Sequence, residues 1–152
     1  MSIAPGTRDL SGQLYNIDVL RMAARVAEFP PLAEAHEREE RRSPTCGSRV
    51  AVTLALADDG TVEAIGVDAK ACALGQAAAA ILASAVRGRD AADLSQASEA
   101  WRAYLAGETE QLPDWPGIDL LAAGRDYPAR HPSMRLAFEA ASAALARAGA
   151  HG

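Results

Sequence analysis

The residues best suited to chemistry in this chain are its two cysteines, Cys46 and Cys72. Cys46 lies in the segment Ser-Pro-Thr-Cys-Gly-Ser, where Gly47 allows a sharp turn and Ser48 offers an oxygen. Cys72 lies where a helix is expected to begin, beside unpaired backbone N–H groups and the positive end of the helix dipole. Two activated thiols could bind a soft metal or an iron–sulfur cluster, carry sulfur as a persulfide, or oxidise to a disulfide.

The alternative is that both cysteines are inert, because free cysteine is commonly buried as a small apolar side chain. A closed structural metal site needs about four ligands, and the chain supplies only two cysteines. The cations Arg49 and Lys70, which lie near the cysteines in sequence, favour the reactive interpretation because positive charge stabilises a thiolate.

The elements around the cysteines predict that the two thiols meet in space. Apolar residues alternate with small or polar ones over 50–56 and again over 62–69, and Asp-Asp-Gly at 58–60 supplies a turn between them. This pattern predicts an antiparallel hairpin. Because a hairpin brings the start of its first strand beside the end of its second, Cys46 and Cys72 are expected to be neighbours.

Most of the remaining chain has helical periodicity, with an apolar stripe on one face over 73–87 and with Trp101 and Tyr104 expected in the core. Helices are predicted over 13–28, 73–87, 90–107 and from Ser133 onward, with one short helical turn over 118–122; the charged stretch 33–42 is predicted to be a solvated loop or a short edge strand. Strands in one part of the chain and helices in another indicate an α+β fold. We expect one domain over 1–152, in which a small antiparallel sheet of two to three strands is covered by four to five helices.

Composition narrows the classes of function. The net charge of −5 and the lack of a strongly basic block argue against a nucleic-acid partner, and no apolar run long enough for a membrane span occurs. The absence of a signal-peptide pattern predicts a cytoplasmic protein with reduced thiols. No histidine is placed as a base for Ser48 or Ser133, so we do not expect an enzyme.

Two segments together resemble the U-type scaffold proteins of iron–sulfur cluster assembly, the NifU-like family. Ser-Pro-Thr-Cys-Gly-Ser at 43–48 is similar to the family's Pro-x-Cys-Gly-Asp turn, and Ala-Cys-Ala-Leu-Gly-Gln-Ala at 71–77 is similar to its Gly-Cys-Ala-x-Ser-x-Ala segment. The hairpin between these segments, the first helix, the alanine-rich helix and the closing helix also follow the family's order. The resemblance therefore covers most of the chain.

The resemblance implies a four-ligand site for zinc or a nascent iron–sulfur cluster, made by three cysteines and an aspartate. Cys46 and Cys72 match the first two cysteines, whereas Ser48 stands at the aspartate position and Ser133 at the third cysteine. The expected metal-binding set is therefore Cys46, Cys72, Ser48 and Ser133, with two hydroxyls that are poorer ligands than thiolate and carboxylate. His131 lies near the site in sequence, and His36 has only carboxylates beside it as metal-binding neighbours.

The function that this resemblance implies is a scaffold that binds iron or a cluster through Cys46 and Cys72 and accepts sulfur from a cysteine desulfurase. Its partners would be the desulfurase and other iron–sulfur assembly proteins, and a homodimer could share the cluster. Two alternatives stay open from the residues alone. One is a metal-free binding module of the assembly machinery, and the other is a thiol redox or persulfide carrier.

Overall fold

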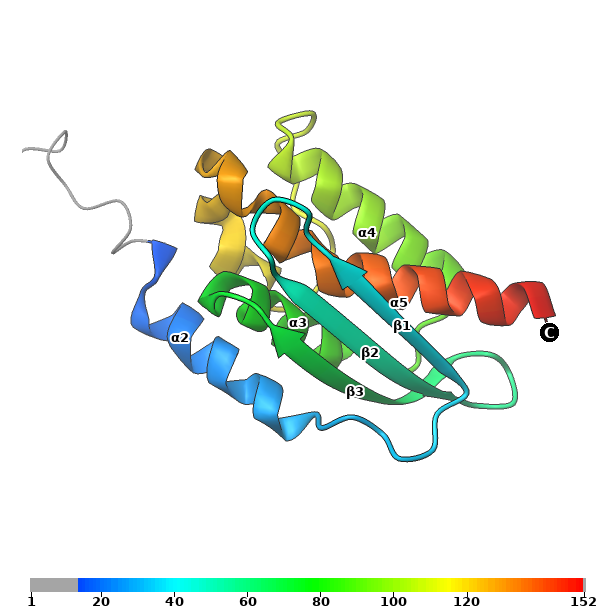
Figure 1. The fold of residues 1–152 in the computed structure, drawn as a ribbon. Coiled ribbons are helices and arrows are strands. Elements are labelled where there is room, and N and C mark those ends of the chain that lie inside the picture. Colours follow the sequence, from blue (N-terminus) through cyan, green and yellow to red (C-terminus); the bar gives the residue numbers. More distant parts are fainter. Residues whose placement is uncertain (1–13, 152) are drawn as a thin grey trace, which may run out of the picture.

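The computed structural model describes residues 14–151 and contains a three-stranded antiparallel sheet with helices packed on one of its faces (Figure 1). The strands lie in the order β1-β2-β3 and are β1 (Glu37–Arg42), β2 (Arg49–Leu56) and β3 (Val62–Lys70). The helical elements are α2 (Ile17–Ala24), η2 (Arg25–Glu28), α3 (Ala73–Ala85), α4 (Ala91–Leu105), η3 (Ile118–Asp126), η4 (Pro128–Arg130) and α5 (His131–His151). The predicted α+β fold is confirmed.

The predicted hairpin is the centre of the sheet. β2 and β3 pair with Arg49 opposite Lys70 and Val52 opposite Val67, and a bulge near Leu56 precedes the turn. Val50, Val52 and Leu54 of β2 are fully buried on the face that α5 covers, as the alternating pattern requires. The register therefore places the start of β2 and the end of β3 at the same end of the sheet, which is the left-hand end in Figure 1.

The charged segment 33–42, for which a loop and an edge strand were both open, forms the edge strand β1 over Glu37–Arg42. Its inward-facing carboxylates are held by α5. Arg147 donates from Nε to Glu37 Oε1 and from Nη1 to Glu39 Oε1, each at 2.7 Å, and from Nη2 to the Arg38 carbonyl. An arginine fork thus gives a strand without apolar side chains a fixed place against the last helix.

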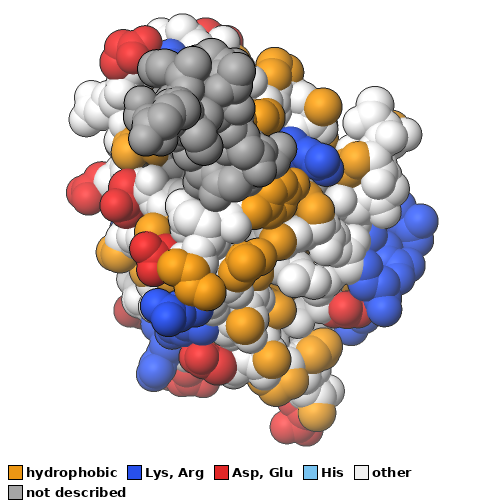
Figure 2. Space-filling model, turned by 90° about the vertical axis from the view of Figure 1, so that its left-hand side faces the viewer, with side chains coloured by type: hydrophobic (Ala, Val, Ile, Leu, Met, Phe, Trp, Pro, Cys, Tyr) orange, Lys and Arg blue, Asp and Glu red, His pale blue; other side chains and the backbone are white. Residues whose placement is uncertain are grey.

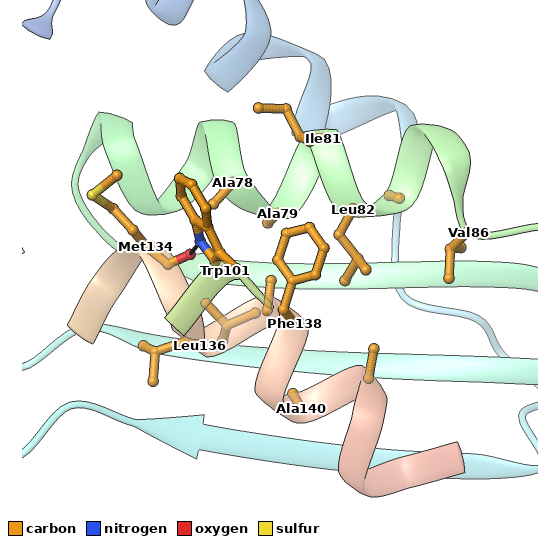
Figure 3. Packing of buried hydrophobic residues seen from close by; sticks show 14 of the residues in the cluster. Ala78, Ala79, Ile81, Leu82, Val86, Trp101, Met134, Leu136, Phe138 and Ala140 are labelled. Carbon is orange, nitrogen blue, oxygen red and sulfur yellow. Dashed lines mark hydrogen bonds between the residues drawn. The ribbon is translucent and has the colours of Figure 1, made fainter. Parts of the chain in front are cut away.

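The alanine-rich helix α3 is buried on almost every side, whereas its sequence predicted an apolar stripe on one face. Its buried residues run without interruption from Ala77 to Ala83. The physical reason is that α2 packs on one side of α3 while α5 and β3 pack on the others. Small side chains allow this close approach, and Figure 3 shows Phe138 of α5 pointing toward the alanines and Leu82 of α3.

The two other long helices begin and end near their predicted bounds. Asp90 caps α4 in a capping box with Asp93, and the predicted core residues Trp101 and Tyr104 are buried. α5 begins at His131, two residues before the prediction, with proline in its first turn. No helix within residues 14–151 is long and apolar enough to cross a membrane.

The first predicted helix, over 13–28, is shorter and changes type. An α-helix capped by Asn16 covers Ile17–Ala24, and a 3₁₀ helix continues it over Arg25–Glu28. Residue 13 lies outside the described residues. The chain then leaves this helix at Phe29 and, through the two prolines that follow, crosses the outer face of the sheet.

Gly66 in β3 makes this crossing feasible. A Cβ at Gly66 would lie against the Pro30 carbonyl oxygen, 2.6 Å from Pro31 Cα and 2.7 Å from the Leu32 nitrogen, all of them backbone atoms. The Leu32 N–H also donates to Thr53 Oγ1 at 3.0 Å, and the Val67 N–H donates to the Phe29 carbonyl at 2.7 Å. The segment therefore lies directly on the backbone of β3 at Gly66 and is held beside it by the Thr53 side chain.

Gly66→Ala is expected to lower the free energy of unfolding by about 1–3 kcal/mol, because the added methyl group must displace backbone. Urea denaturation followed by circular dichroism would measure it. The matched control is Gly149→Ala in α5, where a Cβ meets nothing within 4 Å. That change should raise the stability by roughly 0.5–1 kcal/mol, since alanine favours a helix. Equal effects of the two changes would contradict this account of Gly66.

Candidate functional site

The two cysteines lie at one end of the sheet. Cys46 is in the turn between β1 and β2, which the Ser43 N–H closes by donating to the Ser48 carbonyl at 2.9 Å. Cys72 comes directly after β3 and is the N-cap residue of α3. Since Arg49 and Lys70 are register partners, the hairpin brings both cysteine segments to the same end, as the sequence predicted. Each thiol there has a serine as its hydrogen-bond partner.

Cys46 is an exposed cysteine in a polar turn. Its Sγ lies 3.3 Å from Ser48 Oγ, and its backbone N–H donates to Ser43 Oγ at 3.3 Å. Gly47 has a φ of +75°, a conformation that favours glycine and turns the chain back between the cysteine and the serine. Ser43 and Ser48 are themselves buried, so their hydroxyls are fixed beneath an accessible sulfur.

Hydrogen bonding to the Ser43 hydroxyl lowers the pKa of Cys46 below its ordinary value, and hydrogen bonding to the Ser48 hydroxyl is the second-largest cause. The cause is that a hydroxyl can turn and donate to the thiolate, which stabilises the charged form. Near neutral pH, Cys46 is therefore present as the thiolate to a larger extent than an ordinary cysteine is. The thiolate is the nucleophilic form of the side chain. This turn therefore presents an accessible and activated sulfur.

Cys72 has different surroundings. Its Sγ lies 3.4 Å from Ser133 Oγ, which comes from the first turn of α5. The Ser133 hydroxyl donates its single hydrogen to the Arg130 carbonyl at 3.1 Å, so the Cys72 thiol is the donor in the contact between them. Ser133 is almost completely buried and Cys72 is half-buried. This pair joins the starts of α3 and α5 behind the exposed turn.

The four residues predicted as metal ligands thus form two pairs, Cys46 with Ser48 and Cys72 with Ser133. Among residues 14–151, no three histidine, cysteine or acidic side chains are grouped as a metal site would require. The two thiols are the strong donors of this site, and both serine hydroxyls already make hydrogen bonds.

His131 and His36, the two histidines considered as possible ligands from the sequence, have structural partners. His131 Nε2 lies 3.0 Å from the carbonyl oxygens of both Gly124 and Arg125, so it carries the proton and holds η3 against the start of α5. The backbone of His36 donates to the Leu54 carbonyl, and its Nδ1 accepts from the Leu56 N–H at 2.9 Å. Through these hydrogen bonds to the backbone, His131 and His36 help to hold neighbouring segments of the fold together.

Sequence reasoning missed Ser43, which is the buried partner of Cys46. The signal available was its spacing, because a serine three residues before an amide in a turn often accepts from that amide. It also missed that Arg42, at the end of β1, lies opposite Arg49. That pairing could not be read from the sequence while the segment 33–42 stayed open between a loop and a strand.

Ser48→Ala is expected to raise the pKa of Cys46 and to slow its alkylation by iodoacetamide near neutral pH several-fold. The lowered pKa of this thiol stabilises the folded protein only above the ordinary thiol pKa, and this contribution disappears as the pH falls through the lowered value. Rates of alkylation against pH, resolved by peptide mass spectrometry, would give the midpoint for Cys46.

Ser84→Ala is the matched control for this change, since the Ser84 hydroxyl donates to the Ala80 carbonyl within α3 and does not touch either cysteine. It should leave the alkylation profile of Cys46 unchanged. A midpoint that does not move upward in Ser48→Ala would contradict the role given to Ser48.

Comparison with known proteins gives structural relatives only. No family model and no curated protein matches the chain. Among solved structures, the N-terminal part of a nitrogen-fixing NifU-like protein from Brucella abortus is similar at 30% sequence identity and a TM-score of 0.86, over 95% of this chain and 100% of that one. An iron–sulfur cluster assembly scaffold protein for the SUF system from Fervidobacterium islandicum AW-1 is similar in fold, with 17% identity and a TM-score of 0.77 over 89% and 98%.

Proposed function

Since this chain belongs to the NifU-like family of U-type scaffold proteins, we propose that it carries iron or a nascent iron–sulfur cluster as cargo on Cys46 and Cys72 and accepts sulfur at Cys46. The observation that carries the proposal is the exposed Cys46 thiol, activated by two serine hydroxyls at the same end of the sheet as Cys72. The sulfur donor would be a cysteine desulfurase.

The donor atoms at this site suit cargo better than a resident zinc ion. A closed zinc site has four ligands, usually thiolate, imidazole or carboxylate, whereas the second member of each pair here is a hydroxyl. Hydroxyls are weak ligands for zinc and iron beside thiolates. Two thiolates without a full set of protein ligands suit a cluster that is held briefly and passed on.

The sulfur-transfer step needs only Cys46 and the persulfide of the donor. The Cys46 thiolate attacks the terminal sulfur of the donor's persulfide, a new sulfur–sulfur bond forms on Cys46, and the donor's own sulfur–sulfur bond breaks. The donor cysteine leaves as a thiolate, so no electrons are gained or lost overall. Ser43 and Ser48 assist by stabilising Cys46 as the thiolate before the attack.

The test is to incubate the protein with cysteine and a purified cysteine desulfurase, and to measure intact and peptide masses. We expect the mass of one added sulfur atom on Cys46, lost in Cys46→Ala and kept in Cys72→Ala. Anaerobic reconstitution with iron and sulfide then tests the cargo, with iron retained by the unaltered protein and lost from each alanine variant. Absence of iron from all three proteins would count against cargo binding.

A metal-free persulfide or redox carrier is the second candidate, favoured by the fact that both serines hydrogen-bond to thiols. Such a carrier would accept sulfur by the same step but would hold no iron. Sulfur on Cys46 without retained iron would therefore favour this second candidate. Mild oxidation should then also yield a Cys46–Cys72 disulfide. If desulfurase binding survives the change of both cysteines to alanine while neither iron nor sulfur is held, a metal-free docking module is the better description.

A further inference from the structure

Three cations stand in a row across the sheet at its cysteine end. Arg42 of β1 is the register partner of Arg49 in β2, and Arg49 is in turn the partner of Lys70 in β3. Directly opposed residues project on the same face, and like charges in such positions repel each other. We call Arg42, Arg49 and Lys70 the basic row.

The basic row lies on the outer face of the sheet, away from α5. In β2 the side chains alternate, and Val50 and Val52 are buried against the helices, so Arg49 must point the other way. Lys and Arg side chains gather at the right-hand edge of Figure 2, the side to which the outer face of the sheet turns in that view. Arg42 and Lys70 are exposed and Arg49 is half-buried.

The positive charge of this row is only partly compensated. Arg42 pairs with Glu40, with 2.9 Å between Nε and Oε2, on an exposed surface. Within residues 14–151, neither Arg49 nor Lys70 has an ion-pair partner. The nearest acidic residues on this face, Glu40 and Asp68, both lie opposite Ala51 in the next rank of the sheet, farther from the cysteines. The end of the sheet is therefore left positive in a chain of net charge −5.

The two cysteines lie directly beyond this row. Cys46 is in the turn that joins Arg42 to Arg49, and Cys72 follows Lys70 by two residues. A protein that reaches the exposed sulfur of Cys46 would also cover the row. We propose that the basic row docks an acidic surface of the protein that exchanges sulfur or cargo at Cys46; the docking is inferred from charge, and the partner's task rests on the proposed function.

The positive charge of the basic row favours an acidic protein surface over two other possible partners, a second copy of the chain and a nucleic acid. A second copy of the chain placed face to face on this surface would set the same three cations against each other, so the row does not fit a symmetric dimer contact. A nucleic acid would gain few phosphate contacts from three cations and would be repelled by the rest of an acidic chain. A protein surface rich in aspartate and glutamate gives the complementary potential without these costs.

The experiment measures binding of a fluorescein-labelled polyglutamate peptide to the full chain by anisotropy. We expect binding at about 0.1 M NaCl that disappears near 1 M, where the Debye length shortens from about 10 Å to about 3 Å. Arg42→Glu with Lys70→Glu should weaken binding on the order of tenfold or more. Each new carboxylate would lie opposite Arg49, where attraction replaces repulsion and offsets the exposed Arg42–Glu40 pair that is lost, so the melting temperature should stay close to that of the unaltered protein.

The matched control is Arg21→Glu with Arg87→Glu, which makes the same change in net charge at two exposed positions away from the row. It should weaken peptide binding only about twofold. Equal losses in the two double variants, no binding at low salt, or tighter binding of duplex DNA than of the peptide would each overturn the proposal. Cys46→Ala with Cys72→Ala should bind the peptide as the unaltered protein does, so docking is tested separately from sulfur transfer and cargo binding.

Discussion

Ser48→Asp combined with Ser133→Cys is expected to give a protein that retains zinc through purification. The double change supplies the carboxylate and the third thiolate that the family pattern has at these positions. Because Ser133 Oγ already lies 3.4 Å from Cys72 Sγ, a sulfur at position 133 would be next to the thiol of Cys72. We expect the affinity for Zn²⁺ to rise on the order of a hundredfold or more, equivalent to about 2.8 kcal/mol.

Competition with a coloured chelator would measure this gain, with elemental analysis of the purified protein beside it. The control is Ser48→Asp with Ser142→Cys, which has the same number of thiols but places the third one about 13 Å farther along α5. That variant should bind zinc no more tightly than Ser48→Asp alone. Equal affinities of the two double variants would show that the place of Ser133 beside Cys72 is irrelevant to metal binding.

Trp101→Ala is expected to cause the largest loss of stability among single substitutions in the core. The indole is fully buried, and its Nε1–H donates to the Met134 carbonyl at 2.9 Å (Figure 3). Its ring also stacks on Tyr104, with 6.0 Å between the ring centroids. Truncation leaves a cavity between α4 and α5 and removes the hydrogen bond at the start of α5. We expect a loss of about 3–5 kcal/mol in the free energy of unfolding.

Urea denaturation would measure this loss, provided that the slope of the transition stays the same in both proteins. Trp101→Phe separates the two contributions, because it keeps an aromatic ring and removes the donor to Met134. Its cost should be clearly smaller, and it should include the loss of one hydrogen bond, about 0.5–1.5 kcal/mol, since the Met134 carbonyl still accepts a backbone N–H within α5. A Trp101→Ala protein as stable as the Trp101→Phe protein would contradict the cavity argument.

The elements were predictable because local signals in the sequence agreed with one another. The hairpin had alternating apolar residues on both sides of Asp-Asp-Gly, and α4 had both its cap at Asp90 and a helical repeat through Trp101. The burial of α3 was underestimated, since a run of alanines does not reveal how many neighbours will pack on it. The crossing at Gly66 was not predicted either, because it depends on where two prolines outside the sheet come to lie.

The position of the two cysteine segments could be predicted from the sequence, but the hydrogen-bond partners of the thiols could not. The hairpin alone placed the two cysteine segments at one end of the sheet, because pairing fixes which strand ends meet. The contact of Cys72 with Ser133 joins residues far apart in the chain, so it depended on the packing of α3 against α5. The basic row needed the register of β1, which no local pattern in Glu-Arg-Glu-Glu-Arg-Arg determines.

The charges of β1 also bear on how the protein behaves at high concentration. Among the described residues, β1 pairs on one side only, so its other side presents free backbone donors and acceptors to a strand from another molecule. Such pairing is the first step of β-aggregation. A strand added here would gain backbone hydrogen bonds but no apolar burial, because Glu37 and Glu39 carry charge on one face and Arg38 and Arg42 on the other. The charges of β1 therefore oppose the addition of a strand at this open edge, and the Arg147 fork holds β1 in place without apolar side chains.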